Sequence, residues 1–386
     1  MKKILFLAIS ATLLAAGCQK TEVLNRLGDS MTFTTEMSKL TKADSDLDLP
    51  DAEGTGVGNL QAQNFKVWAY AAYNDSNNGI TAGAVYDGMS ALDVTYDTSW
   101  STEKEYYWPG TDKSLDFFAV STEKWSVATA PEVVISGQGQ TDLSTRKLEY
   151  QNYSVDSADP NDDLMVAEFV RQDQSQNSKK VNLHFKHALA KVTFKFKTLP
   201  DDEDPATPEP PTVIVKSLIV KGLKTTGTLT VTPATTQSQA DETTTADLTR
   251  TPVKLAWNTE SSATDDFSDD YSTSYHFPEG TENTDNDDDA MLLTSTAQPF
   301  TTWLVMPQTI ASKQVEVKYV INKREFTTIF DLTNEGAVPE WAINQAITYT
   351  VTLAPNVISF NPTVEDWDIY DADADTNGDQ DVDMMN

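Results

Sequence analysis

Residues 181–197, VNLHFKHALAKVTFKFK, decide the fold because they carry two alternating hydrophobic patterns in succession. The apolar residues from Val181 to Phe185 occupy odd positions, whereas those from Val192 onward occupy even positions. Side chains along a strand alternate between the two faces of a sheet. The change of parity therefore predicts a bulge, a bend or a new strand in another sheet within 187–190. We place the junction between two domains here.

The composition points to an all-β protein with two domains. The chain has 386 residues, which is enough for two hydrophobic cores. Thr, Ser and Asp are abundant, and few apolar segments have a helical period. The net charge of −31 leaves no basic surface for a nucleic-acid backbone, so we exclude nucleic acid as a partner.

The N-terminus has the features of an exported lipoprotein. Two lysines precede an apolar run at 4–16, which is too short to span a membrane and ends in small residues. Leu-Ala-Ala-Gly then leads to Cys18, the only cysteine, and resembles a bacterial lipobox with Ala where Leu is usual. We expect 1–17 to be a signal peptide and acyl chains on Cys18 to be the membrane anchor. An ordinary secretory signal, with Cys18 incidental, is the alternative.

Further strands are predicted from their apolar patterns. Residues 65–70 and 115–120 are apolar on both faces, which is typical of strands in the centre of a sheet. Residues 31–37 alternate as a short first strand, and an acidic loop at 44–59 follows it. The other predicted strands are 213–220, 227–231, 300–306, 315–321, 326–332 and 347–353.

Two long polar stretches, 235–247 and 258–289, interrupt the second half. They are rich in Thr, Ser, Asp and Glu and show no strand period. Loops of this length are uncommon inside a compact domain. We predict that both are surface insertions.

The sequence contains no motif that indicates an enzyme or a cofactor. His184 and His187 are three residues apart, so on a strand they point to opposite faces and cannot chelate one metal together. Motifs for hydrolases, metalloproteases, phosphate loops and dinucleotides are absent. We expect structural histidines, no cofactor and no catalytic activity.

The acidic tail, 371–386, has a weak resemblance to a calcium-binding loop. Its oxygen ligands would be Asp373, Asp375, Asn377 and Asp379. Gly378 stands at the turn position, but Met384 stands where a bidentate acid is required. We interpret the tail as a solvated acidic segment and expect no metal site.

An aromatic segment allows two interpretations. Trp100, Tyr106, Tyr107 and Trp108 could form an exposed surface that stacks on carbohydrate, or they could belong to a core. Aromatic residues in strands are more often buried.

Taken in order, several segments resemble the fimbrillin-like (Mfa-like) subunits of type V pili, which are outer-membrane lipoproteins of Gram-negative anaerobes. Each segment is short, and the resemblance rests on their order and spacing over nearly the whole chain. The segments are Cys18, 41–43, 107–109, 115–119, 163–167, 183–192, 222–227, 304–308, 349–353 and 358–367.

The resemblance implies a fold of two transthyretin-like Greek-key β-sandwich domains in tandem, at 43–185 and 186–370. It also implies that 18–42 hold the lipidated tether and a removable first strand. In such subunits a protease removes the first strand, and a strand from the next subunit takes its place. The implied role is that of a structural, accessory or tip subunit of a fimbria at the outer membrane, which supports adhesion to surfaces.

The processing site and the donor strand depart from the family pattern. Lys42 precedes Ala43 where the family usually has Arg, and Arg26 is an alternative site. The candidate donor residues are Val357, Ile358, Phe360, Val364 and Trp367. An acidic tail follows them, so a tip or accessory position fits as well as a stalk position. The alternative function is an unpolymerised surface lipoprotein that binds a host glycan or protein.

Overall fold

The structure is a computed structural model and is built from β-strands, which confirms the all-β prediction. In the part of the chain that the structure describes, the helical element is the 3₁₀ turn η3 (Leu143–Thr145). Among the residues that the structure describes, no helix is long and apolar enough to cross a membrane. The residues that the structure describes are 29–37, 64–121, 132–158, 160, 162–175, 179–199, 213–234, 250–259, 263–270, 291–321, 324–333, 338–354 and 357–366.

The first sheet has nine strands, and its main path runs β1-β10-β8-β5-β2-β3-β4. β9 joins this sheet beside β5, and β14 pairs with β9. Its strands are β1 (Thr32–Met37), β2 (Phe65–Ala71), β3 (Leu92–Tyr96), β4 (Trp100–Thr102), β5 (Leu115–Ser121), β8 (Met165–Ala167), β9 (Phe169–Gln172), β10 (Lys180–His187) and β14 (Arg250–Thr251).

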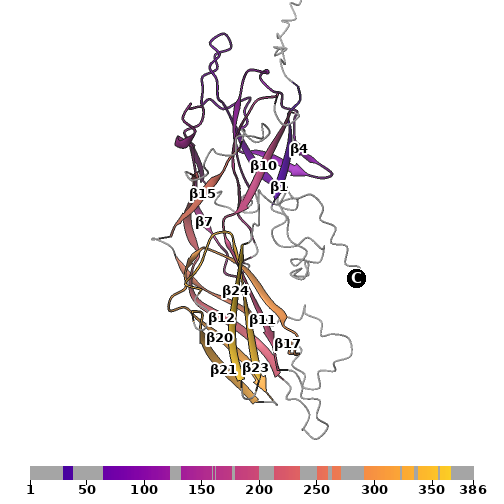
Figure 1. The fold of residues 1–386 in the computed structure, drawn as a ribbon, viewed down its shortest axis with the longest axis vertical. Coiled ribbons are helices and arrows are strands. Elements are labelled where there is room, and N and C mark those ends of the chain that lie inside the picture. Colours follow the sequence, from indigo (N-terminus) through magenta and orange to yellow (C-terminus); the bar gives the residue numbers. More distant parts are fainter. Residues whose placement is uncertain are drawn as a thin grey trace, which may run out of the picture.

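The second sheet has the order β15-β13-β7-β6 and lies at the same end of the molecule as the first (Figure 1). Its strands are β6 (Glu132–Ser136), β7 (Lys147–Ser154), β13 (Thr226–Pro233) and β15 (Val253–Asn258). β13 pairs with both β7 and β15, so two strands from the second half of the chain complete a sheet begun by the first half.

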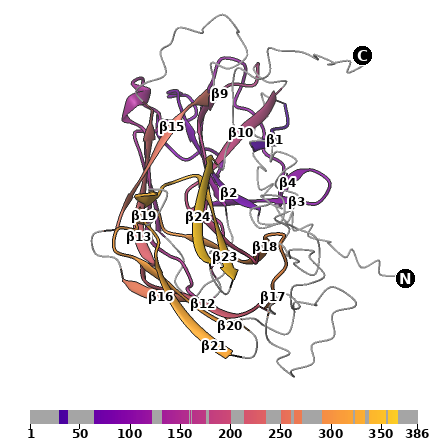
Figure 2. The ribbon, with the colours of Figure 1, turned by 60° about the horizontal axis from the view of Figure 1, so that its bottom comes forward.

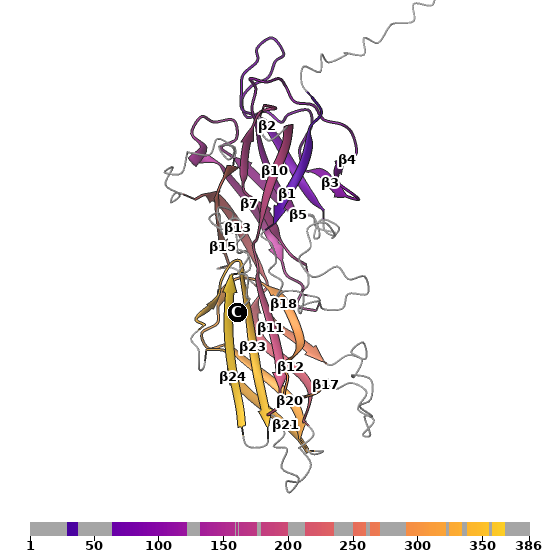
Figure 3. The ribbon, with the colours of Figure 1, turned by 45° about the vertical axis from the view of Figure 1, so that its right-hand side comes forward.

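Two further sheets occupy the other end of the molecule (Figure 3). The third has the order β18-β11-β23-β24, from β11 (Ala190–Lys197), β18 (Gln298–Val305), β23 (Gln345–Ala354) and β24 (Val357–Asp366). The fourth has the path β16-β12-β20-β21 with β17 beside β12, from β12 (Val213–Lys224), β16 (Thr264–Asp270), β17 (Met291–Leu292), β20 (Gln314–Ile321) and β21 (Arg324–Asp331). β19 (Gln308–Thr309) and β22 (Glu340–Trp341) form a separate pair.

The change of parity within 187–190 corresponds to a change of sheet. β10 ends at His187 in the first sheet, and β11 begins at Ala190 in the third. Of the three outcomes allowed, the new strand in another sheet is confirmed. The sheets do not divide at residue 185, because β13 and β15 follow this residue in the chain but share a sheet with β6 and β7, which precede it. The division into 43–185 and 186–370 therefore stays a prediction.

Two hydrophobic cores lie among these sheets. The larger one runs through both ends of the molecule and includes one face of the first sheet, through Trp68 and Phe118. The smaller one lies on the opposite face of the first sheet, around Phe65 and Phe117. β2 and β5 are thus buried on both faces, as their continuous apolar pattern predicted.

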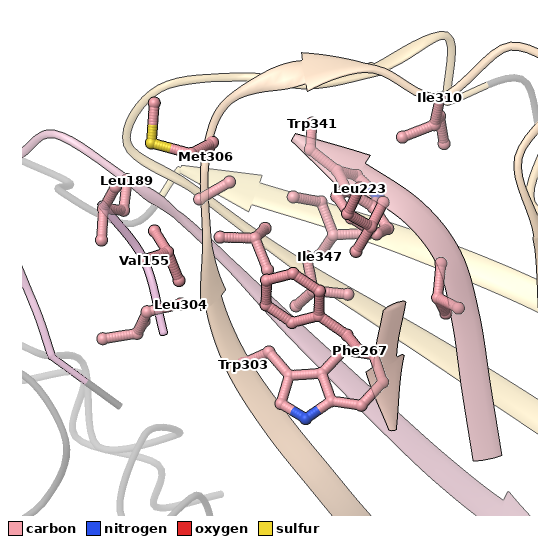
Figure 4. Close-up of a cluster of buried hydrophobic side chains, with 14 of the residues drawn as sticks. Val155, Leu189, Leu223, Phe267, Trp303, Leu304, Met306, Ile310, Trp341 and Ile347 are labelled. Carbon is pink, nitrogen blue, oxygen red and sulfur yellow. The ribbon is translucent and has the colours of Figure 1, made fainter. Parts of the chain in front are cut away.

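The prediction of a surface insertion at 258–289 is wrong in part. β16 (Thr264–Asp270) lies inside this stretch and pairs antiparallel with β12. Its apolar residue Phe267 is fully buried, and its ring lies beside the indole of Trp303 at a centroid distance of 5.8 Å (Figure 4). One buried aromatic residue and backbone pairing are enough to hold a strand whose neighbouring side chains are mostly acidic. The 235–247 stretch lies outside the described residues.

Candidate functional site

The first strand, β1, lies at the edge of the first sheet and runs parallel to β10. The register pairs each residue from Thr32 to Met37 with one from Lys180 to Phe185. Thr34 Oγ1 also donates to Asn182 Oδ1 at 3.4 Å across a separation of 148 residues. β1 is therefore attached to the fold entirely by non-local contacts.

The inward side chains of β1 cover the smaller core. Phe33 is only 5% exposed although β1 is an edge strand, and Met31, directly before β1, is 6% exposed. The ring of Phe33 makes edge-on contacts with Phe65 and Phe117, with centroids 6.2 and 6.4 Å apart. Removal of β1 would expose part of this core to water, which is unfavourable in proportion to the apolar area uncovered.

The start of β1 is held on its other side by the aromatic segment. Met31 N donates to Tyr106 O at 2.8 Å, and Trp108 N donates to Asp29 O at 3.0 Å. Trp108 Nε1 in turn donates to Lys179 O, next to β10, at 3.1 Å. We call the space between β10, residues 105–108 and Trp100 the first-strand slot.

Trp100 on β4 closes the slot near its far end. β1 and β4 are the two ends of the sheet path, yet Trp100 Nε1 donates to Thr35 Oγ1 at 2.8 Å. The first sheet therefore curls until β4, at one end of its path, lies beside β1, at the other end (Figure 1). β1 is bonded on both sides, unlike an ordinary edge strand.

The aromatic segment is thus part of the slot and not an exposed stacking surface. Tyr106 and Trp108 are 4% and 1% exposed. Tyr107 O accepts a hydrogen bond from the hydroxyl of Tyr86 at 2.5 Å, and burial raises the pKa of Tyr86. Of the two sequence interpretations, the core reading holds for Tyr106 and Trp108.

The predicted donor segment forms β24, which pairs antiparallel with all ten residues of β23 (Figure 2). Val364 on β24 is 43% exposed although its register partner, Ile347, is fully buried. Donation of this segment to another chain would require β24 to leave β23.

The two histidines on β10 have separate carboxylate partners. His187 Nδ1 lies 2.6 Å from Asp163 Oδ2, and His184 Nδ1 lies 3.4 Å from Glu168 Oε2. All four residues are buried, and the described residues hold no group of three or more metal-ligating side chains. A structural role in fastening β10 fits this geometry.

Several predicted residues lie outside the described part of the chain. They are Cys18, Arg26, Lys42, Ala43, Trp367 and the tail residues Asp373, Asp375, Asn377 and Asp379. The lipidation site, the processing sites and the tail therefore stay predictions.

Comparison with known proteins identifies the family. The family model described as fimbrillin-like matches residues 55–367, which is most of the chain. The chain belongs to the fimbrillin-like family. This membership implies a place in a surface fimbrium and association with other fimbrial subunits. A search of curated proteins found no match.

This fimbrillin-like protein also resembles solved structures at low identity. A fimbrial protein from Bacteroides vulgatus is 15% identical with a TM-score of 0.46, over 88% of this chain and 99% of that one. A candidate cell adhesion protein from Bacteroides uniformis is 16% identical with a TM-score of 0.41, over 79% and 91%. A fimbrial assembly protein from Parabacteroides distasonis is 10% identical with a TM-score of 0.34, over 88% and 99%. The family assignment rests on the family model and not on these distant likenesses.

Sequence reasoning placed β1 as a strand but missed its slot. The parallel partner β10 and the clasp from Trp100 are distant in the sequence, and no local pattern links them. A partial signal existed beside Trp108, because Pro109-Gly110 marks a turn at this point of the chain.

Proposed function

We propose that this fimbrillin-like protein is a fimbrial subunit that accepts a strand from a neighbouring subunit in the first-strand slot. One observation carries the proposal: β1 covers a core and is bonded on both sides, yet it is joined to the rest of the fold by a single chain segment, 38–63. A cut in that segment would leave β1 held by noncovalent contacts alone.

A slot that has lost β1 would be unstable until another strand replaced it. Its edge on β10 would present unpaired backbone groups over the whole length of β1, and the core around Phe65 and Phe117 would be uncovered. An extended strand satisfies both needs, because its main chain completes the ladder and its alternate side chains fill the pockets. In this proposal a cut after Lys42 precedes the exchange. A cut at the alternative site, Arg26, would remove the tether before β1 but leave β1 joined to the rest of the chain through 38–63.

Export and anchoring complete the proposal. Cys18 would carry the lipid that holds the subunit on the outer membrane until processing separates the tether, 18–42, from the remaining chain. The Cys18→Ala change would then release the unprocessed protein from the membrane fraction. Retention of that variant in the membrane after a salt wash would contradict the lipoprotein proposal.

Uptake of a labelled first-strand peptide tests strand acceptance. The chain from residue 19 onward would be treated briefly with trypsin and mixed with a fluorescein-labelled peptide of residues 29–42. We expect the cut protein to bind the peptide, as measured by fluorescence anisotropy, and the uncut protein to exclude it. The matched control is the Lys39→Gln and Lys42→Gln variant, which trypsin should leave intact at this segment.

Two results would contradict the proposal. One is an absence of peptide binding by protein that is fully cut between residues 38 and 63. The other is equal binding by the doubly substituted control. In either case a stand-alone surface lipoprotein would be the better account. Immunogold electron microscopy of cells should show the parent chain, but not the control, in filaments.

A further inference from the structure

We propose that Trp100 selects which strand the slot accepts. The preferred occupant runs parallel to β10 and carries two apolar residues at alternate positions, followed two residues later by a side chain that accepts a hydrogen bond. This inference rests on the proposed function and names the partner of the same slot.

Trp100 is held rigidly enough to act as a fixed donor. Its indole packs against Phe65 with centroids 4.8 Å apart and against Tyr96 with centroids 5.1 Å apart. Tyr96 is also its register partner in the β3–β4 pair. The Nε1 hydrogen is therefore directed at one place on the neighbouring strand, where Thr35 Oγ1 accepts it at 2.8 Å.

The occupant's inward row follows from the period of two along β1 and Met31, the residue directly before it. Met31, Phe33 and Thr35 share one face, whereas Thr32 and Thr34 lie on the other. The first two inward residues are buried in the smaller core, and the third meets the indole. The three inward positions thus carry two apolar side chains followed by a side chain with a hydroxyl group.

An aliphatic side chain at the third inward position would leave the indole N–H without an acceptor. An indole nitrogen can only donate, and a partly buried donor that loses its partner destabilises the complex. Valine has nearly the shape of threonine, so the comparison isolates the hydrogen bond. The expected loss of affinity is about five- to tenfold.

The C-terminal segment of this same chain does not match the row. In β24 the apolar pair at alternate positions, Ile358 and Phe360, is followed by Pro362 where Thr35 stands in β1. Proline offers no side-chain acceptor and no backbone N–H. The slot therefore favours a strand from a different subunit over the C-terminal strand of a second copy.

Competition among peptides tests the inference on the trypsin-cut protein. The probe is the labelled peptide of residues 29–42, displaced by unlabelled versions that carry Thr35→Val, Thr35→Ser or Thr32→Val, and by a peptide of residues 357–366. Thr32 is exposed, so its change is the matched control. We expect Thr35→Val to compete about five- to tenfold more weakly, Thr35→Ser and Thr32→Val to compete like the parent, and the 357–366 peptide to compete weakest.

A Trp100→Phe protein then separates recognition from general stability. It should bind the parent peptide and the Thr35→Val peptide equally well, because the donor is gone. The matched control is Trp257→Phe, since Trp257 Nε1 donates to Ala188 O at 2.6 Å outside the slot. This control should keep the discrimination of the parent protein.

The outcomes distinguish the inference from the proposed function. Equal competition by the parent and Thr35→Val peptides, discrimination that survives in Trp100→Phe, or parent-like competition by the 357–366 peptide would each overturn the selection by Trp100 while strand acceptance stands. Failure of every peptide to bind would overturn both.

Discussion

β1 and β24 are both terminal strands of their sheets, but they are built in opposite ways. β1 pairs over six residues, in parallel, with a partner 148 residues away. β24 pairs over ten residues, antiparallel, with the strand that precedes it across a two-residue connection, 355–356. Phe33 of β1 and Met31 directly before it are buried in a core, whereas Val364 of β24 is 43% exposed.

The difference shows how one chain can contain a replaceable strand and a permanent one. Parallel pairs are slightly less stable per residue than antiparallel pairs, and they need a long connection. A single cut in the connection to β1 makes it a separate peptide, while the short hairpin keeps β24 tethered at a high effective concentration. The core that β1 covers makes its loss costly, so an empty slot favours rebinding.

The largest expected effect on stability concerns the core of the third sheet, on β11 and on β23, the strand that pairs with β24. Phe194 of β11 and Tyr349 of β23 are fully buried and stacked, with centroids 5.2 Å apart and planes 16° apart. Changing either to Ala should lower the free energy of unfolding by about 3–5 kcal/mol, because each leaves a cavity. The double variant should lose less than the two single losses together, since the residues share one contact. Urea unfolding measures all three, and parent-like midpoints would show that β23 is not the anchor of this sheet.

A smaller and more local effect is expected for Phe33→Ala. The change removes about 3 kcal/mol of packing from β1, so the strand should detach more often while the rest of the fold stays intact. Hydrogen exchange should accelerate in residues 32–37 and in the paired part of β10, but not in β23. The matched control, Val364→Ala on β24, should change stability by less than about 0.5 kcal/mol. Uniform acceleration across all sheets would contradict the separation of the two regions.

The smallest expected effect concerns high pH at β23. Burial raises the pKa of Tyr349 to about 12, against the opposing hydrogen bond from Trp341 Nε1 at 2.9 Å. The unfolded tyrosine ionises near pH 10, so this contribution to stability is complete below pH 10 and is lost as the pH rises towards 12. Tyr349→Phe should flatten that decline at a cost of about 1–2 kcal/mol at neutral pH, because Trp341 loses its acceptor. An unchanged alkaline slope in the variant would contradict the assignment.

The local pattern of the sequence predicted most strands of this protein correctly. Alternation identified β1, β20 and β23, and continuous apolar runs identified β2 and β5 as central strands. β16 was missed because four of its seven residues are Asp, and a single buried Phe267 carries its only apolar signal.

Pairing over long distances could not be predicted in the same way. β13 pairs with β7, and β1 pairs with β10, although the two strands of each pair are far apart in the sequence. Each pairing depends on backbone hydrogen bonds and buried side chains that come together only in the folded chain. Neither match leaves a local trace in the sequence. The resemblance to a family supplied the idea of a removable strand, but the structure was needed to show what holds it, which is the ladder with β10, the packing of Phe33 and the contact between Trp100 and Thr35.

A reversible lock on β1 tests the central claim most directly. Thr34 and Asn182 are register partners with side-chain oxygens 3.4 Å apart, so Thr34→Cys with Asn182→Cys should form a disulfide in the chain from residue 19 onward, which has no other cysteine. The control lock is Thr350→Cys with Asn361→Cys, which joins β23 to β24.

After trypsin treatment, the oxidised β1 lock should exclude the labelled peptide of residues 29–42, and reduction should restore binding to the level of the cut parent. The control lock should bind the peptide equally well in both states. Peptide binding by the oxidised β1 lock, or no binding after its reduction, would contradict the account of β1 as a strand that another subunit replaces.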